Sequence, residues 1–242
     1  MKKFTCLLIL CFMFIGISKV SASTYYTNTN GVNFTEEEYN YISELYYDGY
    51  QSIMKQEDLD KMRNYGLIGQ PISKNKTEEK LGTRSTSVTG GGRTLTITSS
   101  CSSTICLVSL SAQWSGKPSV QSWDVIGFRY SNVTGVSPNS ASVLGTGYSA
   151  TYYTDGDSFQ QFTNGFGYSV KLGNSSNMNV SASFYCNPGG VVYGSYQHAV
   201  ESVSKATSKL YTIGVGGYGY VFHFYGNAYG KYDGAPGVYK NI

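Results

Sequence analysis

The sequence contains few side chains that could carry out nucleophilic or acid–base chemistry. Its two histidines are His198 and His223, and Cys186 precedes the first of them by twelve residues. A thiol and an imidazole at that spacing could face each other across a hairpin, with the imidazole as base. A packed thiol and a structural imidazole are the commoner arrangement, and we predict that one. His223 lies between two phenylalanines and is predicted to be a solvated or hydrogen-bonded strand residue.

Carboxylates are sparse in the C-terminal two thirds of the chain. Asp155 and Asp157 have a spacing that calcium loops use, but the later acids of such a loop are absent, and Asp-Gly predicts a β-turn. Asp124 and Glu201 are the two candidates for the acid pair of a glycoside hydrolase. No HExxH, GxSxG, phosphate-binding loop or dinucleotide fingerprint occurs. The sequence therefore predicts no catalytic residue, no metal site and no cofactor.

Aromatic side chains are the stronger signal. Residues 86–242 contain fifteen Tyr, seven Phe and two Trp, against thirteen charged side chains. Exposed Tyr and Trp can stack on sugar rings or lie at a membrane interface, because each combines an apolar ring with one polar tip. Each could equally be a strand residue whose polar tip reaches the surface. The candidate binding residues are Trp123, Tyr152, Tyr153, Tyr196, Tyr225 and Tyr229.

The aromatic excess favours a non-catalytic binding or adhesion module whose partner is a cell-surface or cell-wall polysaccharide. Ring stacking would act there together with hydrogen bonds from Asn, Ser and Thr at loop tips. The alternative is a membrane-active or pore-forming β protein with a membrane surface as partner, because residues 174–185 alternate polar and apolar side chains. An ordinary half-buried strand shows the same alternation. A hydrolase with an unrecognised site is the third hypothesis.

The elements that would position these side chains are mostly strands. Period-2 alternation marks strand segments that begin near residues 95, 106, 178, 210 and 218. Turn-forming combinations of Gly, Pro, Asn and Asp separate them. No strand is followed by a long amphipathic helix, which disfavours a parallel sheet. About eight to ten strands at this spacing predict an all-β domain over residues 94–242, an antiparallel β-sandwich or a jelly roll.

Residues 23–65 differ in being acidic, tyrosine-rich and helical in pattern. Thr35 and Glu38 have the spacing of a capping box, in which each side chain bonds the other residue's backbone amide. Apolar side chains recur at helical spacing from Tyr39 to Ile53, and a second short helix is expected over residues 56–62. This segment is predicted to be a small helical hairpin whose tyrosines form a packing face.

Residues 66–93 are predicted to be a linker, because they are rich in Gly, Ser, Thr and Lys and show no sustained apolar period. Several basic residues in this stretch would be open to trypsin-like proteases. The hairpin before it could therefore be a removable propeptide.

Residues 1–22 are predicted to be a secretory signal peptide. Two lysines precede an apolar run, and Val20-Ser21-Ala22 offers the small residues for cleavage after Ala22. The run is shorter than the roughly 20 residues that a membrane span needs. The mature protein is expected to be secreted and extracellular. Without the three lysines of this segment it has fifteen basic and fifteen acidic side chains and no clustered basic face, which argues against a nucleic-acid partner.

Export would leave three cysteines in an oxidising compartment, so at least one has no partner within the chain. Cys101 could bond Cys106 through a tight turn, Cys106 could bond Cys186 across strands, or all three could be thiols.

One stretch resembles known sequences. Tyr25-Tyr26-Thr27-Asn28, Asn30-Gly31-Val32 and Phe34-Thr35-Glu36-Glu37-Glu38-Tyr39 resemble a segment found just after the signal peptide in uncharacterised secreted proteins of Gram-positive, Firmicutes-type bacteria. The resemblance covers about 40 residues. It implies an exported protein of such a source, and it carries over no activity and no catalytic residue. The β region resembles no family.

Overall fold

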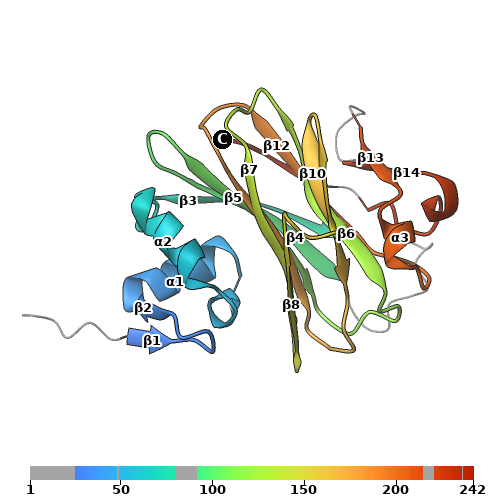
Figure 1. Ribbon diagram of the computed structural model, residues 1–242, viewed down its shortest axis with the longest axis horizontal. Helices are drawn as coiled ribbons and strands as arrows, with labels where there is room; N and C mark the ends of the chain where they lie inside the picture. The colour runs from blue at the N-terminus through green and yellow to red at the C-terminus, as the bar shows by residue number, and fades with distance from the viewer. Residues whose placement is uncertain (1–24, 48, 80–91, 215–220, 236) are drawn as a thin grey trace, which may run out of the picture.

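The structure, a computed structural model, describes residues 25–47, 49–79, 92–214, 221–235 and 237–242. The predicted signal peptide and residues 80–91 of the predicted linker lie outside the described residues. The body of the protein consists of two antiparallel sheets packed face to face, with a smaller lobe on each side (Figure 1).

The larger sheet has six strands. Their order across the sheet is β3 (Ile72–Glu79), β4 (Arg93–Cys101), β5 (Cys106–Trp114), β11 (Asn179–Cys186), β7 (Ser137–Gly145) and β8 (Tyr148–Tyr153). The second sheet has five, in the order β15 (Val238–Asn241), β12 (Val191–Gln197), β6 (Trp123–Ser131), β10 (Gly165–Lys171) and β9 (Phe159–Phe162). Every neighbouring pair in both sheets is antiparallel. The prediction of an all-β body made of antiparallel sheets is confirmed.

The main core lies between the two sheets. Because successive side chains of a strand point to opposite faces, alternate residues of β5 and β11 face inward. Phe128, Phe166 and Phe184 meet at the centre of this core, with ring centroids 4.9 to 5.5 Å apart. All three side chains are completely buried, and such burial contributes roughly 1.5–3 kcal/mol for each ring.

A lobe formed by residues 25–47 and 49–67, here the N-terminal lobe, covers the outer face of the six-stranded sheet (Figure 1). Its elements are β1 (Tyr25–Thr27), β2 (Asn33–Thr35), α1 (Glu36–Leu45), the 3-10 helix η1 (Tyr50–Ser52) and α2 (Gln56–Asn64). The predicted capping box is present at the start of α1. Phe34 and Leu45 pack with Leu107 and Tyr185, which point outward from the sheet. No helix among the described residues is long and apolar enough to cross a membrane.

The C-terminal lobe, residues 205–214 and 221–232, lies against the outer face of the five-stranded sheet (Figure 1). It contains α3 (Lys205–Ser208), β13 (Tyr211–Ile213), β14 (Phe222–Phe224) and the 3-10 helix η2 (Gly226–Ala228). Gly167 of β10 allows the close approach. A Cβ atom there would lie 2.6 Å from the Tyr211 hydroxyl and 2.9 Å from the Phe222 ring. Part of the strand expected from residue 218 onward lies outside the described residues.

The linker prediction is wrong for residues 72–79, which form the edge strand β3. This strand pairs with β4 along its whole length, from Ile72 opposite Ser100 to Glu79 opposite Arg93. Backbone hydrogen bonds hold an edge strand, and its side chains can remain polar and exposed. Residues 73–76 are exposed, so they show no apolar period that could have indicated a strand.

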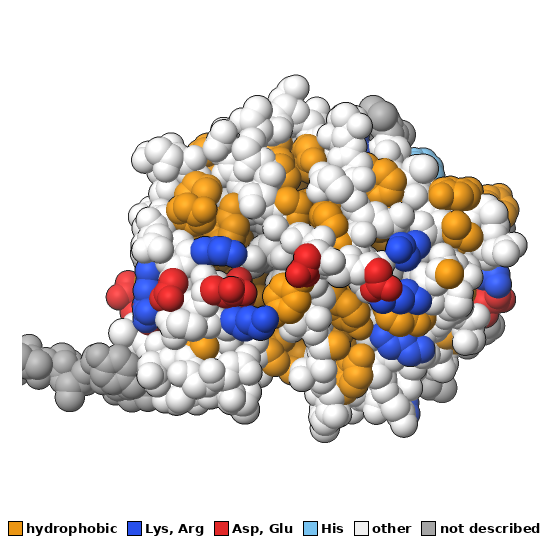
Figure 2. All heavy atoms as spheres, viewed as in Figure 1, with side chains coloured by type: hydrophobic (Ala, Val, Ile, Leu, Met, Phe, Trp, Pro, Cys, Tyr) orange, Lys and Arg blue, Asp and Glu red, His pale blue; other side chains and the backbone are white. Residues whose placement is uncertain are grey.

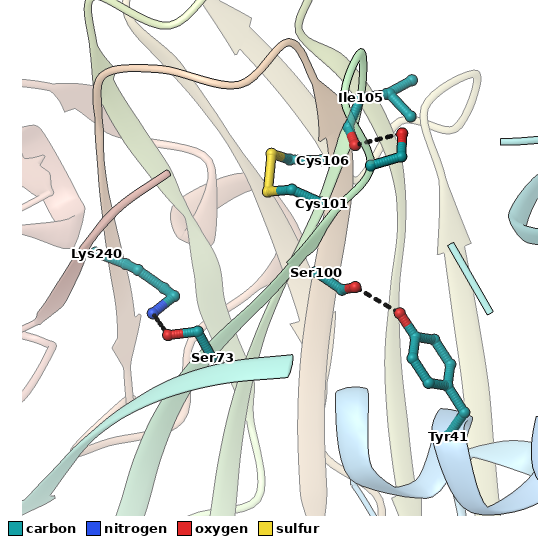
Figure 3. Close-up of a disulfide and its surroundings, with 8 residues drawn as sticks. Tyr41, Ser73, Ser100, Cys101, Ile105, Cys106 and Lys240 are labelled. Carbon is teal, nitrogen blue, oxygen red and sulfur yellow. Dashed lines mark hydrogen bonds between the residues drawn. A yellow bond between two sulfur atoms is a disulfide. The ribbon is translucent and has the colours of Figure 1, made fainter. Parts of the chain in front are cut away.

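The disulfide joins Cys101 to Cys106 and closes the turn between β4 and β5 (Figure 3). Of the alternatives left open by the sequence, the short pairing is the one observed. Cys186 lies opposite Cys106 in the β5–β11 register but is free and buried. Burial raises the pKa of the Cys186 thiol to about 12, so this thiol is protonated at neutral pH and a poor nucleophile.

Candidate functional site

The hypothesis of a thiol nucleophile paired with a histidine base is wrong. The His198 ring lies 4.8 Å from the ring of Trp114, at one end of β5. Cys186 lies opposite Cys106, at the other end of the same strand. Eight residues of extended strand separate these ends by about 26 Å. The imidazole and the thiol therefore belong to different parts of the core.

His198 instead belongs to a buried polar network centred on Asp124. The His198 Nδ1 atom lies 2.9 Å from Asp124 Oδ2, and the Ala199 amide donates to Oδ1 at 3.0 Å. The Tyr196 hydroxyl donates to the same carboxylate and accepts from Trp114 Nε1 at 3.2 Å. Asp124 and His198 are completely buried. This arrangement satisfies a buried carboxylate within the core, and neither Asp124 nor His198 is exposed to solvent.

The placement of Tyr196 contradicts its prediction as a binding residue. Its side chain is completely buried in the main core, and burial holds the pKa of its phenol well above the usual range. The Arg93 guanidinium lies 4.9 Å from the Tyr196 ring centroid and 2.7 Å from the buried Asp233 carboxylate. Tyr196 therefore stabilises the interior and is inaccessible to any ligand.

The other acidic candidates do not assemble into a catalytic or metal site. Glu201 is exposed and forms a 2.7 Å ion pair with Lys231. Asp155 lies in a turn, as predicted, and Asp157 pairs with Lys205. Within the part of the chain that the structure describes, no group of three His, Cys, Asp or Glu side chains is placed to hold a metal ion.

The remaining predicted binding residues fall into three separate places. Trp123 and Tyr152 are half-buried neighbours, with ring centroids 6.4 Å apart. The Tyr152 hydroxyl accepts from the Lys171 amide at 2.8 Å, and burial raises its pKa. The Lys55 ammonium of the N-terminal lobe lies 4.1 Å from the centroid of the Tyr153 ring. Tyr225 and Tyr229 are exposed in the C-terminal lobe. The structure does not bring these side chains into one surface.

A different set of side chains does form a continuous row on one face of a sheet. Tyr239 of β15 lies directly opposite Tyr193 of β12, which lies directly opposite Arg129 of β6. Directly opposed residues of antiparallel strands project from the same face of a sheet. These three residues, here the Tyr-Arg row, therefore cross three strands on the outer face of the five-stranded sheet. Three adjacent strands give the row a width of about 10 Å.

The members of the row contact one another. The Tyr193 and Tyr239 ring centroids are 6.2 Å apart at an interplanar angle of 36°, and the Arg129 guanidinium lies 4.0 Å from the Tyr193 centroid. Tyr239 is 53% exposed, while Tyr193 and Arg129 are half-buried. The row is thus an ordered aromatic surface with a cation at one end.

Neighbouring elements hold the row in place. The Asn75 amide of β3 donates to the Tyr239 carbonyl at 2.8 Å. The next residue, Lys240, points to the opposite face and donates to Ser73 at 2.7 Å (Figure 3). On the other side, the core of the C-terminal lobe packs against Tyr193. The short strand β15 is therefore fixed by both sheets.

The prediction missed this row, although part of its signal was present in the sequence. Tyr193 and Tyr196 are three residues apart on one strand, so they must point to opposite faces. The sequence did not indicate which of them faces outward, and no strand was predicted at residues 238–241. The row joins residues that are far apart in the sequence, because Tyr193 pairs with Tyr239, 46 positions later, and with Arg129, 64 positions earlier.

Charged side chains are interleaved on the face of the molecule seen in Figure 2. Basic and acidic groups alternate in a band that runs from the N-terminal lobe across the body. Ion pairs such as Lys74–Glu44 and Lys231–Glu201 belong to the described surface. This face therefore has no continuous basic surface of the kind that binds nucleic acid.

Comparisons with known proteins give little further information. No protein-family model matches the chain. No curated protein matches it either. Among solved structures, the KRT10-binding region domain of the pneumococcal serine rich repeat protein PsrP is similar over 53% of this chain and 86% of that one, with 5% sequence identity and a TM-score of 0.35. A likeness of this extent identifies neither a family nor a ligand.

Proposed function

We propose that this protein is a secreted, non-catalytic binding module that contacts a cell-surface or cell-wall glycan through the Tyr-Arg row. The observation that carries the proposal is the alignment of Tyr239, Tyr193 and Arg129 on one face of the sheet. A flat sugar face stacks on aromatic rings, and the phenol hydroxyls offer hydrogen bonds at their edges.

The neighbouring positions supply the polar groups that sugar hydroxyls need. Asn241 and Ser131 lie one step further along the same face, on either side of Val191. Both polar side chains are exposed. A surface built on paired strands loses little conformational freedom when a ligand binds, so more of the contact energy appears as affinity.

Secretion is part of this proposal. The sequence of residues 1–22 supports a signal peptide cleaved after Ala22. The Cys101–Cys106 disulfide supports it further, because disulfides persist in oxidising compartments.

No described contact favours the alternative of a membrane-active protein. That hypothesis depended on the polar–apolar alternation of residues 174–185, most of which form β11. All eight residues of this strand are buried. Its apolar side faces the main core, and its serine side lies on the face that the N-terminal lobe covers. Dye release from liposomes by the purified protein would contradict the binding-module proposal.

The proposal is tested by retention of the protein on immobilised cell-wall and host polysaccharides. Tyr239→Ser and Tyr193→Ser should each weaken binding about tenfold, because each removes a stacking ring. Tyr229→Ser is the matched control, since Tyr229 is 80% exposed but lies in the C-terminal lobe. Loss of binding in Tyr229→Ser with none in Tyr239→Ser would move the site to that lobe. Failure of the unaltered protein to bind any polysaccharide would refute the proposal.

A further inference from the structure

We infer that the glycan bound at the Tyr-Arg row carries a carboxylate, which the Arg129 guanidinium binds. This inference rests on the proposed function. It adds a ligand class, namely an acidic sugar such as a uronic acid, to a surface that ring stacking alone would leave open to neutral sugars.

The first support is that Arg129 forms no ion pair with any carboxylate of the described residues. Of the three arginines in the described residues, Arg63 pairs with Glu38 and Arg93 pairs with Asp233. Arg129 contacts the Tyr193 ring and has no ion pair within the described residues. Its Nε atom is buried without a hydrogen-bond partner there. An anion supplied by a ligand would give this half-buried guanidinium the charged hydrogen-bond partner that it lacks among the described residues.

The second support is the charge of the surrounding strands. In the three strands that carry the row, the one acidic residue is Asp124 of β6. Asp124 lies five residues from Arg129, about 17 Å along an extended strand, and faces the opposite side of the sheet. The outer surface near Arg129 is therefore complementary to an anion.

The third support is the form of the cation. A guanidinium stacked on an aromatic ring keeps its planar fork of donors, which matches the two oxygens of a carboxylate. A phosphate-bearing wall polymer, whose charges repeat along the chain, would be expected to recruit several cations, as polyanion-binding surfaces do. The row offers one. We therefore favour a carboxylate over a phosphate.

The test compares two forms of one polymer. Polygalacturonate and its methyl ester share a backbone, but the carboxylates of the second are capped. The unaltered protein should bind polygalacturonate at least about tenfold more tightly than the ester, and added salt should reduce the difference. A teichoic acid serves as the phosphate-bearing comparison and should bind no better than the ester.

Three variants locate the effect. Arg129→Gln should bind both polymers alike, within about twofold. Arg129→Lys should retain part of the preference, because it keeps the charge but loses the fork. Lys117→Gln removes a surface cation elsewhere and should behave as the unaltered protein. Thermal unfolding of each variant separates lost binding from lost folding.

The outcomes distinguish the inference from the proposed function. Equal binding of the polymer and its ester, with loss in Tyr239→Ser, would overturn the acidic ligand and leave the glycan-binding proposal standing. Preference for the teichoic acid would also overturn the carboxylate. Preference for polygalacturonate that persists in Arg129→Gln would show that another cation is responsible and refute the role of Arg129. Binding to none of these three polymers would refute the carboxylate ligand, and failure on the wider set of cell-wall and host polysaccharides as well would refute the proposed function.

Discussion

The Tyr41 hydroxyl of α1 donates a 2.5 Å hydrogen bond to the Ser100 hydroxyl of β4, across the contact between the N-terminal lobe and the six-stranded sheet (Figure 3). Similar contacts recur along this interface. The Tyr47 hydroxyl lies 3.5 Å from that of Ser142, and the Thr98 hydroxyl donates to the Leu45 carbonyl. Three hydroxyl contacts thus cross this interface, alongside the apolar contacts around Leu107.

The Tyr41–Ser100 contact should contribute measurably to stability. Tyr41→Phe leaves the buried Ser100 hydroxyl without its donor, and we expect the free energy of unfolding to fall by about 1–3 kcal/mol in urea. The double variant Tyr41→Phe/Ser100→Ala removes both partners and should cost less than the sum of the single changes. Strict additivity would show that the two hydroxyls do not interact.

The same interface predicts a loss of stability at alkaline pH. Burial raises the pKa of Tyr47 to about 12, above the value of about 10 for an exposed tyrosine. Between these values the folded protein keeps a proton that the unfolded chain releases, so stability is full below pH 10 and falls as the pH rises toward 12. Urea unfolding at several pH values should show this fall, with a shallower slope for Tyr47→Phe. An unchanged slope in Tyr47→Phe would show that this tyrosine does not cause the alkaline loss of stability.

The Asp124 network should be structural and have no part in catalysis. Asp124→Ala leaves Tyr196, His198 and the Ala199 amide without their acceptor, and we expect it to destabilise the protein by about 3 kcal/mol or more. Glu201→Gln breaks an exposed ion pair and should cost less than about 1 kcal/mol. If Asp124→Ala folded with undiminished stability, the network would need another explanation.

The disulfide pairing makes a separate prediction. Peptide mapping of the oxidised protein should recover Cys101 linked to Cys106, and Cys186→Ala should leave that link intact. Loss of the link in Cys106→Ala should lower stability by roughly 2 kcal/mol, the cost expected for so short a closed loop. Recovery of a Cys106–Cys186 peptide from the unaltered protein would contradict the observed pairing.

Local patterns predicted much of the fold. The Thr35–Glu38 capping box and the alternation of β5 and β11 are properties of consecutive residues, so the sequence alone indicates them. The edge strand β3 escaped prediction because backbone pairing holds it and its side chains remain polar. The Tyr-Arg row escaped for a different reason. Its members meet through long-range strand register, which no local pattern encodes.

Strand β15 has a consequence for how the protein matures. It is the last described strand, and it supplies Tyr239 as well as the Lys240 contact to Ser73. Because ribosomes make chains from the N-terminus onward, β6 and β12 can pair before β15 exists. The Tyr-Arg row is thus completed only after residues 238–241 have been made. A nascent chain arrested before Val238 would retain Arg129 and Tyr193 but lack the outermost ring.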